Sequence, residues 1–191
     1  MHLTHRLALH ILAGCLCAAT SAVAFPQAAA PAKPPVGTPI PPAEVYGKLL
    51  SAQEANFVAT AEAMPEEKYD FAPPVTLGEF KGVRSFGEEV KHVAQANAFF
   101  FHDPTKPLVD TRADFAKLKT KAEIVKALKD SFVLAHTYVD GITAENAFLM
   151  TSNGTRAGIA SQGIAHLMDH YGQMVVYLRM NGIVPPASRP K

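Results

Sequence analysis

The stretch AHLMDHYGQMVVYLRMNGIVPP, residues 165–186, decides the fold class of this chain. Its apolar side chains recur at the spacing of an α-helix, which we expect to run from about residue 155 to residue 181. Gly182 and Pro185 follow the last periodic residue and are typical helix terminators. The stripe expected to face the core consists of Ile164, Leu167, Met168, Tyr171, Val175 and Leu178.

Three earlier segments show the same periodicity and predict helices over residues 43–64, 85–102 and 120–140. No segment shows sustained alternation with a period of two, so no long strand is expected. Four helices in one small domain predict an all-α fold, an antiparallel four-helix bundle that occupies residues 43–188. Two connections between these helices are long, which leaves the order of the helix directions open.

Two of the predicted helices begin at a capping box, in which a Ser or Thr and a Glu three residues later satisfy the first turn. Ser85 pairs with Glu88 in this way, and Thr120 pairs with Glu123. The apolar face expected for the first helix consists of Val45, Leu49, Ala52, Asn56, Val58 and Ala59. The face expected for the third helix consists of Ile124, Leu128, Phe132 and Ala135.

The composition is that of a globular protein, with 48% hydrophobic and 18% charged residues. The formal net charge is +1, and it falls to zero when Arg6, the only charged residue among the first 24, is removed. A chain with no strong positive field and no basic stripe with interleaved aromatic residues offers little to nucleic acid. We therefore expect no nucleic-acid partner.

Residues 1–24 have the pattern of a secretory signal peptide, with a short apolar run after Arg6 and the small-x-small sequence AVA at residues 22–24. The run is shorter than the roughly 20 residues of a membrane-spanning helix, which disfavours an uncleaved anchor. We expect an exported protein, periplasmic or extracellular. In the alternative, the sequence LAGC at residues 12–15 is a lipoprotein signal, and acylated Cys15 holds the chain on a membrane.

Both cysteines of the chain, Cys15 and Cys17, lie in the predicted signal peptide. Cleavage after residue 24 would leave a protein without disulfides, cysteine nucleophiles or cysteine metal ligands. Residues 25–42 are rich in Ala and Pro and nearly uncharged, which indicates a flexible linker before the folded domain.

A second face of the last predicted helix carries His166, His170, Gln173 and Tyr177, where a solvated face would carry Lys, Glu and Arg. His166 and His170 are one helical turn apart, so both imidazoles can reach one atom, as in many transition-metal sites. The spacing alone also fits two histidines that are merely solvated or hydrogen-bonded.

A metal site needs a third ligand, and the candidates are carboxylates and three histidines, His92, His102 and His136. His92 lies in the middle of the second predicted helix, where residues of neighbouring helices can meet in the core of a bundle. His102 lies at a helix end, and His136 lies on the third predicted helix. The position along the helix favours His92 and leaves His136 as the alternative.

Three stretches resemble the DinB-like family of four-helix bundles: AEAMPEEKYDFAP, VRSFGEEVKHVAQAN and HLMDHYGQMVVYLRMNGIVPP. The resemblance spans about residues 43–188. It rests mainly on a histidine in the second helix combined with His-x-x-x-His followed by Gly-Gln in the fourth. In this family the three histidines typically bind one divalent metal ion, zinc or nickel. The resemblance implies that His92, His166 and His170 are the ligands here.

The resemblance also implies a metal-dependent enzyme, a hydrolase or a thiol transferase, acting on a small-molecule substrate that the sequence does not name. Export disfavours the thiol transferase, because low-molecular-weight thiols are mainly cytosolic. Gln173 and Tyr177, on the same face as His166 and His170, are candidates to contact the ligands or the substrate. Alternatively, Gln173 hydrogen-bonds to a neighbouring helix and Tyr177 belongs to the core. The sequence singles out no catalytic acid, base or nucleophile. The alternative is a non-catalytic exported bundle that binds metal, ligand or partner. Members of the family often pair, so a homodimer is possible.

Overall fold

The structure is a computed structural model that describes residues 33–190. The predicted signal peptide, with Cys15 and Cys17, lies outside the described residues, as does the linker up to residue 32. Residues 33–41 contain no helix or strand. No described helix is both long and apolar enough to cross a membrane.

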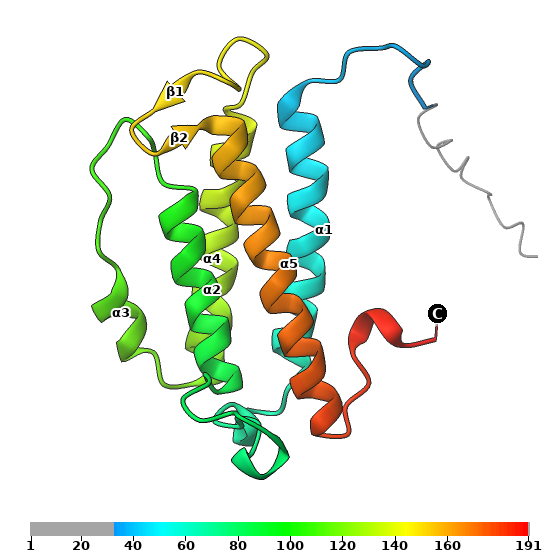
Figure 1. The fold of residues 1–191 in the computed structure, drawn as a ribbon, viewed down its shortest axis with the longest axis vertical. Coiled ribbons are helices and arrows are strands. Elements are labelled where there is room, and N and C mark those ends of the chain that lie inside the picture. Colours follow the sequence, from blue (N-terminus) through cyan, green and yellow to red (C-terminus); the bar gives the residue numbers. More distant parts are fainter. Residues whose placement is uncertain (1–32, 191) are drawn as a thin grey trace, which may run out of the picture. The chain divides into compact units, whose positions relative to one another are not determined.

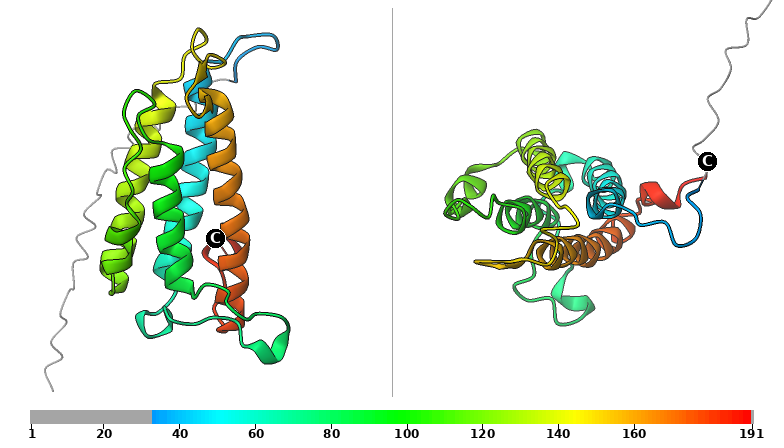
Figure 2. Two further views of the ribbon diagram at one scale, coloured as in Figure 1. Left: turned by 60° about the vertical axis from the view of Figure 1, so that its left-hand side comes forward. Right: turned by 90° about the horizontal axis from the view of Figure 1, so that it is seen from above.

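Four long helices carry the fold: α1 (Pro42–Ala63), α2 (Phe86–Phe100), α4 (Lys121–Asp140) and α5 (Arg156–Met180) (Figure 1). α1 packs against α4 and α5, and α2 packs against the same two helices from the opposite side. The view from above in Figure 2 shows the four helices around a common centre. The all-α four-helix bundle predicted from the sequence is confirmed.

α2 and α4 run in the same direction, antiparallel to α1 and α5 (Figure 1). Asn97 of α2 donates to the hydroxyl of Ser131 of α4, and Phe101 packs its ring against Tyr138, so the two helices are in parallel register. Parallel neighbours need a connection as long as the bundle. Residues 101–120 supply it and carry the short helix α3 (Arg112–Lys117) on the way.

Short elements complete the described chain. Three 3₁₀ turns cover Glu66–Lys68, Val75–Leu77 and Pro186–Ser188. Before α5, β1 (Met150–Thr151) and β2 (Gly154–Thr155) pair as an antiparallel hairpin. Neither α3 nor this hairpin was expected from the sequence, because two to six residues are too few to establish a period.

Both capping boxes are confirmed. The Ser85 hydroxyl accepts from the Glu88 amide at 3.4 Å, and the Glu88 carboxylate accepts from the Ser85 amide at 2.8 Å. The pair Thr120 and Glu123 makes the equivalent contacts at 3.2 and 2.9 Å. These side chains fix where α2 and α4 begin, and therefore the height of every residue that follows on each helix.

The core is as predicted for α4 but differs on α1 and α5. All four residues of the α4 stripe are buried. On α1, Val45 and Leu49 are exposed, and the buried residues are Leu50, Phe57, Thr60 and Ala61. On α5, Met168 is 57% exposed, which corrects the predicted core stripe. α5 packs against both α1 and α2, and its buried residues include His170, Met174 and Tyr177, so its two predicted faces merge into one wide buried arc.

Candidate metal centre

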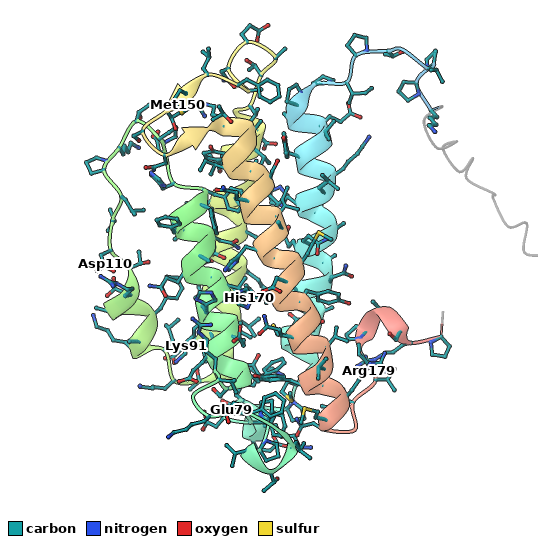
Figure 3. All side chains as sticks on the ribbon, viewed as in Figure 1. Glu79, Lys91, Asp110, Met150, His170 and Arg179 are labelled. Atoms are coloured by element: carbon teal, nitrogen blue, oxygen red, sulfur yellow. The ribbon has the colours of Figure 1, made fainter. Side chains whose placement is uncertain are left out.

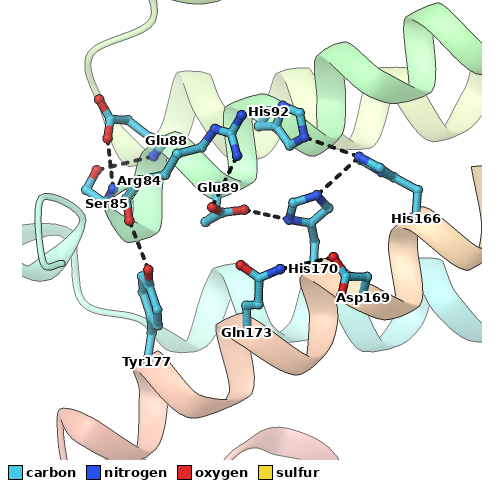
Figure 4. A network of polar contacts seen from close by, with 10 residues as sticks. All are labelled: Arg84, Ser85, Glu88, Glu89, His92, His166, Asp169, His170, Gln173 and Tyr177. Carbon is cyan, nitrogen blue, oxygen red and sulfur yellow. Dashed lines mark hydrogen bonds and ion pairs between the residues drawn. The ribbon is translucent and has the colours of Figure 1, made fainter. Parts of the chain in front are cut away.

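His92, His166 and His170 meet between α2 and α5 (Figure 4). The Nε2 atom of His166 lies 3.2 Å from Nε2 of His92 and 3.1 Å from Nε2 of His170. One nitrogen from each ring lies within 4.8 Å of the others. The sequence indicated the pair on α5 by its spacing, and the antiparallel packing of α2 brings His92 to the same height.

Both separations from His166 are those expected of two ligands on one metal ion. Two nitrogens bound to a tetrahedral zinc ion at 2.0–2.1 Å are about 3.3–3.4 Å apart, and an octahedral arrangement brings neighbouring ligands to about 3 Å. The observed 3.1 and 3.2 Å lie between these values. The three histidines therefore form a group that could hold a metal ion. Because imidazole suits zinc, nickel, iron and copper alike, the ligands do not identify the metal.

The orientation of His170 is set by Glu89, a buried carboxylate on α2. Nδ1 of His170 lies 2.7 Å from Oε2 of Glu89, and the Glu89 side chain is 4% exposed. A carboxylate at this distance accepts the Nδ1 proton, which leaves the lone pair of Nε2 directed at the other two histidines. This contact prepares His170 as a ligand before any ion arrives.

Arg84 lies on the other side of Glu89, with its guanidinium 3.6 Å from Oε1 (Figure 4). Burial alone would raise the pKa of Glu89. The hydrogen bond with His170 and the charges of His170, Arg84 and His92 outweigh burial and lower that pKa. Glu89 is therefore a stable anion at neutral pH, and His170 has a permanent acceptor behind it.

His166 is held neutral by its surroundings. Burial, followed by the proximity of His170 and His92, lowers its pKa to about 4. Its Nδ1 atom is buried without a hydrogen-bond partner among the described residues, and its ring packs against Phe100 at 5.4 Å between centroids. Because a metal binds only the neutral imidazole, the low pKa keeps Nε2 of His166 available as a ligand in mildly acidic solution.

The pKa of His92 is also lowered, but by a different set of neighbours. Burial is the largest cause that lowers its pKa, and the charges of Arg84 and His170 add to it. His92 is half-buried and forms part of the wall of an open cavity, so it connects the three-histidine group to solvent.

Gln173 and Tyr177 lie on α5 below the histidines in Figure 4, but within the described residues neither hydrogen-bonds to any of the three. The Gln173 amide donates to Asp169 at 3.1 Å. Tyr177 is a buried residue, and its hydroxyl donates to the backbone carbonyl of Arg84 at 3.0 Å. Tyr177 therefore contacts the site through Arg84, and its proposed contact with substrate stays a prediction.

The other two candidate ligands are placed elsewhere. His136 of α4 pairs with Glu54 of α1 at 2.8 Å, on a different side of the bundle. His102 follows α2, where Nδ1 lies 2.7 Å from the Phe99 carbonyl and Nε2 lies 3.1 Å from the Asn153 amide. Among the described residues, His92 is the histidine that completes the α5 pair.

Three residues beside the histidines were not predicted from the sequence: Glu89, Arg84 and Phe100. Glu89 stands three residues before His92, so the spacing Glu-x-x-His places both on one side of α2, and this signal was available. Arg84 precedes the helix cap, where the sequence gives no direction for a side chain. Phe100 is an apolar residue of α2, a type that packs into most helical cores, so nothing in the sequence set it apart.

The fold and the site together define a class of protein: a four-helix bundle with a group of histidines between two of its helices. The family model of the DinB superfamily matches residues 49–174, and the chain belongs to that superfamily. A solved crystal structure of a candidate DinB family member from Exiguobacterium sibiricum 255-15 has the same fold. It superimposes with a TM-score of 0.51 over 73% of this chain and 91% of the other, at 18% sequence identity. No curated protein matches the chain.

Proposed function

We propose that this protein binds one divalent transition-metal ion through the Nε2 atoms of His92, His166 and His170. The observation that carries the proposal is the approach of three imidazole nitrogens to within 4.8 Å of one another. Zinc and nickel are the metals that the family resemblance favours. Three neutral ligands leave the charge of the ion intact and at least one position open, as in catalytic metal sites.

We further propose that the site is catalytic and acts as a hydrolase, with a thiol transferase as the second reaction class. A metal ion bound here would lower the pKa of a water or thiol and polarise a substrate. The side chains of the protein would orient the ligands and limit the access of water. Glu89 would hold His170 in its metal-binding tautomer, and Phe100 would shield one side of His166 from water.

Export is the cellular setting that we propose, with the folded domain released after a signal peptide or held at a membrane through Cys15. The support is the sequence pattern of residues 1–24. An oxidising compartment suits a folded domain that contains no cysteine. It also favours hydrolysis over thiol transfer, because the thiol cofactors would be scarce there.

The catalytic part of the proposal is tested by reconstitution. The protein is stripped with a chelator, reloaded with Zn²⁺ or Ni²⁺, and screened against chromogenic esters and phosphoesters, and against an electrophile with a small thiol. We expect turnover by the reloaded protein, and none by the stripped protein or by a His166→Gln variant. Turnover that persists at full rate without metal would contradict the proposal.

A non-catalytic bundle that only binds metal is the second candidate. One observation favours it: no carboxylate of the described residues hydrogen-bonds into the group except Glu89, which is committed to His170. Stoichiometric metal without turnover in any reaction class would support this candidate.

A further inference from the structure

A cavity of about 370 Å³ lies between α2, α3 and residues 82–84, and His92 forms part of its wall. This is within the size range of small-molecule sites in proteins. Val83, Phe115 and Ala116 give it an apolar side, and Gln95 adds an amide. A molecule in this cavity would touch a residue of the proposed metal centre.

The charged side chains of the cavity are mostly cationic. Arg84, Lys91 and Arg112 line it together with one carboxylate, Glu88. Glu88 is committed to the capping box through the Ser85 amide. Two cations of the wall have partners: Arg112 is held by Asp110 at 2.7 Å, and Arg84 faces Glu89 at 3.6 Å. Lys91, by contrast, forms no ion pair with any described carboxylate.

Arg84 is held in place, but the donors of its guanidinium are not used in hydrogen bonds to the described residues. Its carbonyl accepts from the Tyr177 hydroxyl, and its guanidinium faces Glu89, so both ends of the residue are positioned. The guanidinium makes no hydrogen bond within the described part of the chain, and the side chain is 47% exposed. A planar cation with free donors is suited to a carboxylate or a phosphate.

Lys91 follows Arg84 by seven residues in sequence and lies on α2, one residue before His92 (Figure 3). Its half-buried side chain reaches the same cavity as Arg84. Two cations with free donors therefore line a small cavity whose wall includes a proposed metal ligand. A divalent ion at the histidines would add further positive charge beside this cavity.

We propose that the cavity binds the anionic group, a carboxylate or a phosphate, of a small organic substrate, with Arg84 and Lys91 as its anchors. The inference rests on the proposed function, because the anchored molecule would present its reacting atom next to His92. The apolar side formed by Val83, Phe115 and Ala116 would hold its carbon skeleton. The substrate class is thus a small organic anion.

The test titrates zinc-loaded protein with succinate in one arm and inorganic phosphate in the other. Binding is followed by calorimetry and by the backbone NMR signals of Arg84, Lys91 and His92. We expect saturable binding of at least one anion, weakened about tenfold or more in Lys91→Gln and in Arg84→Gln. Lys48→Gln, an exposed lysine of α1 that pairs with Glu44, is the control and should bind like the native protein.

Zinc content is measured on the same samples, so that the two proposals fail separately. Anion binding that is lost in Lys91→Gln while zinc is retained supports the inference. The inference is overturned if neither anion saturates the zinc-loaded native protein. It is also overturned if affinity is lost on zinc removal but unchanged in Lys91→Gln and Arg84→Gln, since the metal alone would then hold the anion. Absence of zinc from the native protein contradicts the proposed function instead.

Discussion

At the scale of single residues, the contact between Glu89 and His170 controls the proposed centre. Two groups from different helices meet at 2.7 Å in a place where both are almost fully buried. A buried carboxylate without a partner would be costly, so the contact satisfies Glu89 and fixes the His170 ring at once. Arg84, which is partly exposed, adds a positive charge beside Glu89 and stabilises its carboxylate.

Replacing Glu89 by Gln should therefore weaken metal binding while leaving all three histidines in place. An amide oxygen is a poorer acceptor than a carboxylate, and it raises the basicity of Nε2 less. We expect zinc affinity to fall about 10- to 100-fold, measured by competition with a chromogenic chelator.

Glu88→Gln is the matched control, because Glu88 is exposed and Gln also completes a capping box. Its zinc affinity should equal that of the native protein. Equal affinities in all three proteins would show that Glu89 has no influence on the metal.

The low pKa of His166 predicts how stability depends on pH in the metal-free protein. Its folded pKa of about 4 lies below the unfolded value near 6.5, so between these values the unfolded chain binds more protons. The contribution of neutral His166 to the free energy of unfolding is complete above about pH 6.5 and is lost as the pH falls toward 4. Allowing for partial solvent access, we expect a loss of about 1 kcal/mol between pH 7 and pH 5.

Urea unfolding of the native protein and of His166→Gln at several pH values measures this contribution, since Gln does not titrate. The difference between the two free energies of unfolding should shrink by that amount on acidification. A difference that stays constant from pH 7 to pH 5 would mean that His166 titrates normally.

The histidines could be predicted from the sequence, and the Glu-x-x-His spacing was a signal for Glu89, but the contact of Glu89 with His170 and the position of Arg84 could not. One helical turn separates His166 from His170, and periodicity alone puts them on one side of a helix. The contact of Glu89 with His170 joins residues 81 positions apart, and it depends on which helices are neighbours and in which direction they run. Arg84 lies before a helix begins, where no period applies.

At the scale of elements, α5 determines how closely the helices approach. Gly163 of α5 faces the ring of Phe101, and a Cβ at this position would overlap that ring. The same helix contains Gly172, which is exposed and would have nothing near an added Cβ. The two glycines differ in surroundings although both lie inside one helix.

Substituting each glycine with Ala separates these effects. Gly172→Ala should stabilise the protein by about 0.5–1 kcal/mol, because Ala loses less backbone entropy in a helix. Gly163→Ala gains the same backbone-entropy advantage but displaces Phe101, and we expect the free energy of unfolding to fall by about 1–2 kcal/mol. Thermal unfolding of the metal-free variants measures both. Stabilisation by Gly163→Ala would show that α2 and α5 are not packed this closely.

Helix boundaries and one core face were predicted well, whereas two faces were not. Capping boxes are local, so the starts of α2 and α4 could be read from four residues each. The α1 face was wrong because Val45 and Leu49 near its start are exposed, and apolar character alone does not say which side packs. The α5 stripe was too narrow because two neighbouring helices bury this helix.

At the scale of the whole molecule, the bundle has a core that does not depend on the metal. Its largest fully buried side chains, among them Phe57, Phe86 and Phe132, come from three different helices. The three histidines lie between α2 and α5 only. Metal binding should therefore add stability to a protein that is already folded, unlike a zinc finger.

Removing the metal should leave the helical circular dichroism signal unchanged at 25 °C, since the core persists. Adding zinc at about one hundred times its dissociation constant should raise the free energy of unfolding by about 2.7 kcal/mol. Loss of helical signal on chelation would show that the core does not hold the bundle without the ion.

The central claim is that His92, His166 and His170 bind one metal ion together. Equilibrium dialysis against Zn²⁺, followed by elemental analysis, tests it on the native protein, on the three single His→Gln variants, and on His136→Gln as the control. We predict one zinc per native chain and per His136→Gln chain, with strong loss in each of the other three. Native protein without zinc, or loss in His136→Gln equal to that in His170→Gln, would contradict the claim.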